Sequence, residues 1–336
     1  MLSKITVSPA PHISQKLTTR GIMLDVLIAL LPAIIAAGFY FRLRALLVIA
    51  VCVVSCVVSE WLCNRLRKRP SSLGDLSAIV TGVILALSLP PAIPYSMAVI
   101  GSAFAIIIVK MLFGGLGSNI FNPAMATRAF LTASFGAAMT TWTVPATINP
   151  EMVALTAANT SATTQATPLA WSKMAQKGLV NPAEVNKQAV WALWGDTGGC
   201  LGETSSIAFL IGGAYLLIRR TITWHIPAAV LLAAGAIALA VWLFKPDTTV
   251  NPLLHLFSGG LMICAFFIAT DPVTAPLSTK GMWIFGLGVG ALIMLIRIVG
   301  EYPEGVMYAV LIMNAISPLI DRFCKLTPAG GIPHVS

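Results

Sequence analysis

The stretches GVILALSLPP (residues 82–91) and GGLMICAFFIATDP (residues 259–272) decide the fold of this chain. Each is an apolar run that begins with glycine, ends in proline and lies inside a longer apolar region. Proline lacks the N–H that a helix interior needs, and glycine weakens a helix. Breaks at membrane depth are tolerated only where protein or a cavity satisfies the freed backbone groups. The two stretches therefore predict membrane helices that break beside buried sites.

The composition assigns the whole chain to the membrane. Of 336 residues, 57% are hydrophobic and only 10% are charged, whereas soluble domains have about 25% charged residues. A helix needs about 20 apolar residues to cross a bilayer. The sequence predicts an all-α polytopic membrane protein with about ten spans, near residues 21–40, 44–63, 75–91, 94–113, 121–138, 204–219, 224–244, 255–271, 281–299 and 304–322.

Charge and cysteine usage exclude several other classes. The net charge of +9 comes from cations in short loops beside apolar runs, as membrane topology requires, so we expect no nucleic-acid partner. The six cysteines form no CxxC pair, and neither His nor further Cys stands at ligand spacing. We expect neither a metal site nor an iron–sulfur cluster held by this chain alone. Residues 1–20 have no apolar core, so no cleavable signal is predicted.

The cations also predict the orientation. Residues 65–69 contain three arginines and a lysine and should be cytoplasmic. Two spans precede them, so the N-terminus is expected to be cytoplasmic too. Counting onward places residues 139–203, with three lysines and four carboxylates, on the outer face. Arg42 and Arg44 then lie outside, against the rule.

The two halves of the chain resemble each other. In each, an apolar run from a glycine to a proline is followed by a helix ending near a cation, Lys110 or Arg297, and then by a glycine turn. Five spans per half give the repeats opposite orientations, as in transporter scaffolds with a site at the repeat interface. The predicted parts are a cytoplasmic segment at 1–20, a five-helix repeat at 21–138, an outer loop at 139–203, a second five-helix repeat at 204–322 and a cytoplasmic tail at 323–336.

A threonine-rich stretch in the outer loop, TTQATPL at residues 163–169, carries no obvious chemistry of its own. From chemistry alone it is a solvated linker. It resembles the flavinylation motif, Ser/Thr-x-Ala-Thr, of the RnfD/NqrB family of membrane flavoproteins. That resemblance implies FMN attached through a phosphoester to Thr167, with Thr163 and Thr164 as alternative hydroxyls. The family usually has Asp-Gly shortly upstream, where this chain has Ser161-Ala162, which puts recognition by the flavin transferase in doubt.

The resemblance covers essentially the whole chain. Its other segments are NIFNPAM at 119–125, GGCLGETS at 198–205, WHIP at 224–227 and ATDPVT at 269–274. It implies that Gly199, Gly202, Glu203 and Thr204 lie near the FMN. Glycines let backbone amides approach a phosphate. Glu203 would repel a bare phosphate, so it either caps a helix or contacts the flavin ring.

Four further polar residues are candidates at membrane depth. Asn119 and Asn122 flank a break, where helix capping is the simple interpretation. The resemblance implies a second, non-covalent riboflavin or a quinone pocket there. Asp25 and Asp271 are carboxylates in or beside apolar spans, and ionisable residues there are candidates for an ion pathway. Asp271 alternatively caps the break or pairs across the repeat interface.

The sequence and the resemblance leave three candidate functions. The length resembles RnfD, which implies a membrane flavoprotein subunit of an ion-translocating ferredoxin:NAD⁺ oxidoreductase, the Rnf complex, in the bacterial inner membrane. It would relay electrons through FMN coupled to Na⁺ or H⁺ transport, and its partners would be a covalent-FMN outer subunit, iron–sulfur subunits, other membrane subunits, a flavin transferase and lipid. The first alternative is an NqrB-like subunit of a Na⁺-pumping NADH:quinone reductase. The second is a flavin-free channel or transporter.

Overall fold

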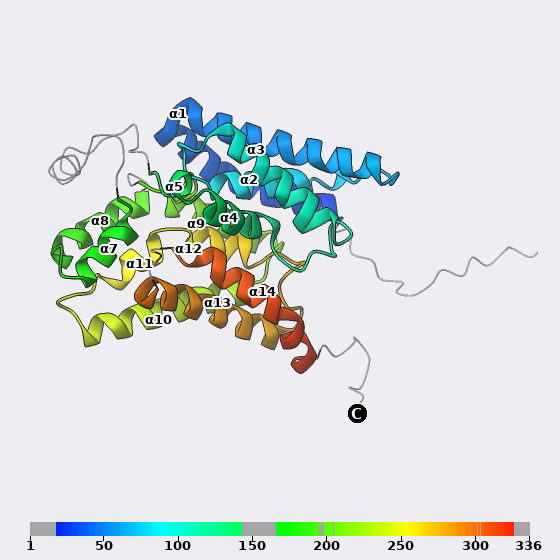
Figure 1. Ribbon diagram of the computed structural model, residues 1–336. Helices are drawn as coiled ribbons and strands as arrows, with labels where there is room; N and C mark the ends of the chain where they lie inside the picture. The colour runs from blue at the N-terminus through cyan, green and yellow to red at the C-terminus, as the bar shows by residue number, and fades with distance from the viewer. Residues whose placement is uncertain are drawn as a thin grey trace, which may run out of the picture.

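The computed structural model describes residues 18–142, 166–194, 198–203, 205–300, 302 and 304–325, without the side chains of 187–192. Within these ranges the regular structure is entirely helical (Figure 1). Among the described residues, four helices are long and apolar enough to cross a membrane: α1 Thr19–Leu66, α10 His225–Phe244, α13 Thr279–Val299 and α14 Val306–Phe323. The prediction of an all-α polytopic membrane protein is confirmed. Ten spans in two inverted repeats stay a prediction.

The first long helix contains a break that separates two of the predicted spans. Arg42 interrupts α1 with φ 58° and ψ −147°. A Cβ built on Gly38 would lie 3.5 Å from the Leu46 side chain, although eight residues of straight helix advance about 12 Å. The chain therefore turns back at Arg42, between the spans predicted at 21–40 and 44–63.

The contacts of Arg44 explain why a cation lies where the positive-inside rule does not expect one. Its guanidinium donates to the carbonyls of Pro91 and Ala92, at 3.0 and 3.1 Å, and lies 5.3 Å from the centre of the Tyr95 ring. These carbonyls follow the end of α2 Ser77–Leu87, where the sequence predicts a helix break. The arginine satisfies backbone groups that a broken membrane helix leaves unpaired, so its role is structural.

The remaining elements outside residues 166–194 are shorter. In chain order they are η1 Leu73–Asp75, α3 Tyr95–Phe104, the π-helix η2 Ala105–Met111, α4 Pro123–Ser134, α5 Gly136–Met139, α9 Ser206–Ile218, α11 Pro252–Phe257, α12 Leu261–Ile263 and the π-helix η3 Cys264–Ile268. The glycines at 259–260 separate α11 from α12, and Gly259 has φ +69°. The predicted break at that point is thus present.

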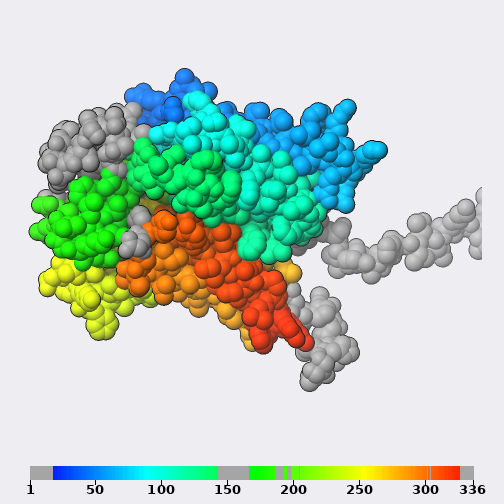
Figure 2. Space-filling model, in the orientation of Figure 1, coloured from blue at the N-terminus to red at the C-terminus, as the bar shows by residue number. Residues whose placement is uncertain are grey.

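The segment predicted as an outer loop contains two helices, α7 Pro168–Gln176 and α8 Pro182–Trp194. They pack beside α11 at one end of the helical bundle, drawn in green at the left of Figures 1 and 2. Trp171 of α7 packs on a small core of Ala175, Val185, Val250 and Leu254. Thr163 and Thr164 lie outside the described residues. Thr167 lies at the start of α7.

Two pairs of helices pack closely at glycine residues. A Cβ on Gly212 of α9 would lie 2.1 Å from the Ala29 carbonyl oxygen of α1. A Cβ on Gly290 of α13 would lie 2.5 Å from the Val230 carbonyl oxygen of α10. Small residues let helix backbones approach in this way in membrane proteins.

Candidate functional site

Thr167 is the residue that begins α7. Its Oγ1 accepts a hydrogen bond from the Ala170 N–H at 3.1 Å, and Pro168 occupies the first helical position. Threonine followed by proline is a favourable helix start, since proline has no N–H to satisfy there. The side chain is only 6% exposed. The hydroxyl predicted to bind FMN is therefore held at a helix N-terminus, where an anionic phosphate is favoured.

A small cavity joins Thr167 to residues distant in the sequence. Its walls are Trp142, Thr167, Pro168, Leu169, Gly198, Glu203, Gly259 and Glu304. The structure thus brings together Thr167 and Glu203, two residues predicted to lie near one cofactor. The cavity measures about 20 Å³, which holds about one water-sized group. It suits a phosphoryl oxygen, and it has no room for an isoalloxazine ring.

Two carboxylates that line this cavity pair with two buried arginines behind it, and we call the four residues the charge cluster: Arg128, Glu203, Arg297 and Glu304. Arg128 of α4 pairs with Glu203 at 3.0 Å, and Arg297 of α13 pairs with Glu304 at 3.4 Å. Arg128 also donates to the Cys200 Sγ at 3.2 Å. Because buried charges are costly without partners, these pairs neutralise the acids that would otherwise repel a phosphate.

The backbone around Gly259 completes the cluster. Glu304 accepts from the Gly260 N–H at 3.0 Å. Arg297 donates to the carbonyls of His255 and Ser258, at 2.6 and 3.0 Å. A Cβ on Gly259 would lie 2.3 Å from Glu304 Oε2 and 2.8 Å from Arg297 Nη2. At the break between α11 and α12, Arg297 and Glu304 thus bond to backbone groups as well as to each other.

The environment of Glu203 alters its acidity. Burial raises the pKa of this carboxyl, the neighbouring Glu304 raises it further, and Arg128 opposes both effects. The net shift is upward, so the protonated form persists to higher pH than for a solvated glutamate.

The glycine segment before α9 packs against the end of α2. The N–H groups of Leu201 and Gly202 donate to the carbonyls of Leu89 and Leu87, at 3.0 and 2.6 Å. A Cβ on Gly199 would lie 3.0 Å from Glu203 Oε2. Gly199 and Gly202 therefore position Glu203, and the Gly202 amide is already bonded to protein. Thr204, also predicted near the FMN, lies outside the described residues.

A Gly202→Ala substitution is expected to destabilise the protein by about 1–3 kcal/mol, the range for overpacking. The new Cβ would lie 2.8 Å from the Leu87 carbonyl oxygen, so the segment that holds Glu203 must move. The measurement is the thermal unfolding temperature of the protein in detergent. Gly74→Ala is the control, because nothing lies within 4 Å of a Cβ there. Equal unfolding temperatures for the two variants would contradict this packing role.

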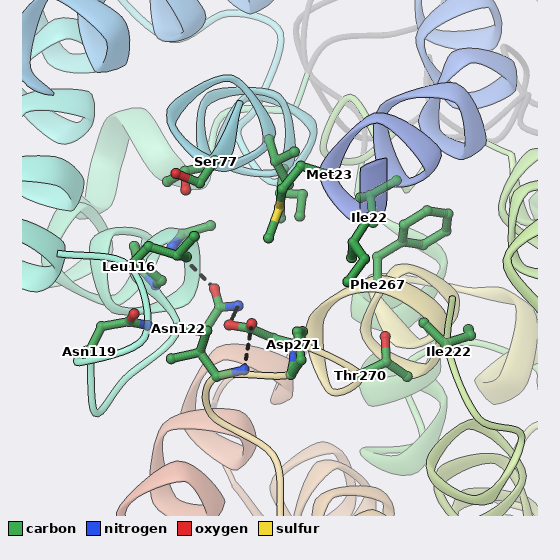
Figure 3. Close-up of a pocket in the computed structure, with 18 of the residues that line it drawn as sticks. Ile22, Met23, Ser77, Leu116, Asn119, Asn122, Ile222, Phe267, Thr270 and Asp271 are labelled. Carbon is green, nitrogen blue, oxygen red and sulfur yellow. Dashed lines mark hydrogen bonds between the residues drawn. The ribbon is translucent and has the colours of Figure 1, made fainter. Parts of the chain in front are cut away.

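A second, larger pocket lies between the two halves of the chain (Figure 3). It measures about 80 Å³, and its walls include Met23, Asn119, Asn122, Phe267 and Asp271. Predicted site residues from the first half, Asn119 and Asn122, thus meet Asp271 from the second. Lys110 also lines this pocket.

Hydrogen bonds within the second pocket connect the halves. Asn122 caps α4 by accepting from the Ala124 N–H at 3.1 Å, and it donates to Asp271 at 3.3 Å. Asp271 also accepts from the Val273 N–H at 3.1 Å. Asn119 donates to the Phe121 carbonyl at 3.1 Å. Asp271 therefore both caps the break and pairs across the halves.

Asp25 of α1 does not line this pocket, although Thr221, which donates to it, does. It accepts from the hydroxyls of Tyr215 and Thr221, at 3.2 and 3.0 Å, and lies 3.4 Å from the exposed Arg219. Its carboxylate is thus well satisfied by protein.

Three residues of the first site were missing from the sequence prediction: Arg128, Trp142 and Glu304 as the partner of Arg297. Arg128 is the only charged residue in the span predicted at 121–138. A charge at that depth is itself a functional signal, and it would have identified the residue. Nothing in the sequence pattern pairs it with Glu203, 75 positions away.

Comparison with known proteins gives matches along nearly the whole chain. The model of the NQR2, RnfD, RnfE family matches residues 6–330. The chain is 44% identical over 322 residues to the D subunit of the Na⁺-translocating ferredoxin:NAD⁺ oxidoreductase complex of Acetobacterium woodii, covering 96% of this chain and 94% of the relative. It is 41% identical to the proton-translocating counterpart of Clostridium ljungdahlii, covering 95% and 94%. It is 40% identical to the D subunit of the ion-translocating oxidoreductase complex of Salmonella paratyphi B, covering 97% of each chain.

Proposed function

Because the chain belongs to the NQR2, RnfD, RnfE family, we propose that it is the membrane flavoprotein subunit of an ion-translocating ferredoxin:NAD⁺ oxidoreductase, with FMN covalently attached to Thr167. The observation that supports the site is the position of Thr167, at a helix N-terminus and in one cavity with Glu203. The match to the D subunits of two such complexes, over more than nine-tenths of each chain, supports the function.

The residues present suit an esterified phosphate. The Thr167 oxygen provides the attachment, and the first turn of α7 directs its N–H groups toward it. Arg128 neutralises Glu203 beside the attachment point. Bound FMN would supply a reversible electron carrier. In this proposal the ring lies outside the 20 Å³ cavity, where partner subunits would reach it.

The remaining chemistry belongs to partners. Among the described residues no group of three or more His, Cys, Asp or Glu is placed to hold a metal ion. In this proposal iron–sulfur clusters, ferredoxin and NAD⁺ are bound by other subunits. In the proposed orientation both termini are cytoplasmic and residues 139–203 are on the outer face. Asp25 and Asp271 remain candidates for the Na⁺ or H⁺ path, although both are hydrogen-bonded in this structure.

The pocket of Asn119 and Asn122 is the proposed place for a non-covalent riboflavin or a quinone. Its apolar walls and few polar groups are typical of cofactor sites. At about 80 Å³ it must widen to admit an isoalloxazine ring.

The test is a denaturing gel of the protein co-expressed with a flavin transferase, viewed under ultraviolet light, followed by peptide mass. A fluorescent band and the mass of FMN less water on the peptide containing Thr167 are the expected results. Flavin released by denaturing the same sample would report non-covalent binding. An unmodified mass, with the transferase active on a control protein, would favour the flavin-free transporter.

The electron acceptor of the purified complex separates the two flavin functions. Reduction of NAD⁺ by ferredoxin is expected for the proposed assignment. Reduction of quinone by NADH would favour the NqrB-like alternative instead.

A further inference from the structure

The hydroxyl of Thr167 is out of reach of a large donor in this structure. The residue is 6% exposed, and its Oγ1 accepts the Ala170 N–H at 3.1 Å. The cavity beside it measures about 20 Å³, which is the space of about one water. Phosphoryl transfer needs the phosphorus about 3–3.5 Å from the attacking oxygen, with the leaving group on the far side. A donor that carries FMN cannot take that position while α7 is in place.

The contacts that hold α7 in place are made mainly by side chains. Leu169 packs on the break between α11 and α12, since a Cβ on Gly259 would lie 2.6 Å from its Cδ1. Lys173 Nζ donates to the Gly300 carbonyl at the end of α13. Trp171 packs on the small core that α7 shares with α8 and α11, and among the helices α7 packs chiefly against α8. The helix therefore lies at the end of the bundle (Figure 1), with a limited attachment to it.

Two polar groups of α7 favour its undocking. Trp171 Nε1 and Ser172 Oγ are buried without a hydrogen-bond partner in the described part of the chain, and each bonds to water when the helix leaves the bundle. The helix has 9 residues, and one of that length is marginal in water. The undocked segment therefore loses the turn that begins at Thr167, which releases Oγ1 from the Ala170 N–H. Weakly attached elements of this kind are the ones that open locally in a folded protein.

We propose that the flavin transferase esterifies Thr167 only while α7 is undocked from the bundle, and that docking of α7 then closes the site. This inference rests on the proposed function. The donor is a flavin dinucleotide. The Thr167 oxygen forms a bond to the FMN phosphorus, the bond from that phosphorus to the bridging pyrophosphate oxygen breaks, the nucleoside monophosphate leaves, and the hydroxyl proton passes to solvent. When α7 docks again, one oxygen of the phosphodiester occupies the cavity beside Glu203.

The experiment measures the initial rate of flavin attachment to the full chain, purified in detergent without its flavin, after the transferase and the dinucleotide are added. The wild type is compared with Lys173→Met, which loses the bond to Gly300. When opening is fast relative to transfer, the rate follows the open population. Lys173→Met should then react about 3–10-fold faster, the effect of one lost hydrogen bond. Lys177→Met, at an exposed lysine that follows α7, is the control and should react like the wild type.

A peptide of residues 160–177 separates docking from recognition by the transferase. It has no bundle on which to dock, so it should react faster than the folded wild type, and its Lys173→Met form should react as fast as the wild-type peptide. Equal rates for the peptide and the folded wild type overturn the proposal, and so does a Lys173→Met protein that reacts no faster than the wild type. The first of these comparisons needs no variant, so it covers the case in which Lys173→Met does not fold.

Peptide mass on the same samples separates failure of this inference from failure of the proposed function. An unmodified Thr167 in both the peptide and the protein, with the transferase active on a control protein, refutes the proposed function and this inference together. Flavin on Thr167 in both at equal rates, or in the folded protein alone, refutes only the need for undocking.

Discussion

A Thr167→Asn variant is expected to lose all covalently bound flavin while remaining folded. Asparagine is as good a helix N-cap as threonine, so it can replace the contact in which Thr167 Oγ1 accepts from the Ala170 N–H. It has no hydroxyl to esterify. The expected result is an unmodified mass and no fluorescent band, at an unfolding temperature close to that of the wild type.

Two companion variants separate attachment from capping. Thr167→Ser keeps both the hydroxyl and the cap, so flavin attachment should be retained. Thr167→Val removes both, and loss of the cap costs about 1 kcal/mol. A normal flavin content in Thr167→Asn would refute the assignment of Thr167 and would direct attention to Thr163 and Thr164.

The membrane fold could be predicted from the sequence because its strongest signals are local. Apolar length predicts helices, and glycine and proline predict the breaks after α2 and between α11 and α12. The helices α7 and α8 were missed, although each begins with a capping residue followed by proline, at Thr167-Pro168 and Asn181-Pro182. That start signal is recognised in soluble proteins, but in this chain the apolar spans dominate the pattern.

The site is less predictable, because its partners meet only through the fold. Arg128 and Glu203 are 75 positions apart, and Asn122 and Asp271 are 149 apart. The π-helices η2 and η3 have wider turns than an α-helix, with hydrogen bonds from i to i+5. The amino-acid composition does not predict these turns either. Lys110 lies in η2, and π-helical turns often occur at functional sites.

A Lys110→Met variant is expected to lose about 3–5 kcal/mol of folding stability, the usual cost of breaking one side of a buried ion pair. Lys110 Nζ donates to Glu60 Oε2 at 2.7 Å and to Ser77 Oγ at 2.6 Å. The two charged side chains are 2% and 0% exposed. The measurement is thermal unfolding in detergent, with Lys245→Met as the control, because Lys245 is exposed at the end of α10.

The double variant Glu60→Gln with Lys110→Met identifies the cause of that loss. Replacing both members removes the uncompensated charge, so the double variant should be more stable than Lys110→Met alone. The coupling between two substitutions in contact is usually about 0.5–3 kcal/mol in size. If the double variant is as unstable as the sum of the single variants, the loss arises from packing around the lysine stem. In that case the ion pair at the edge of the second pocket contributes little to holding α1, α2 and η2 together.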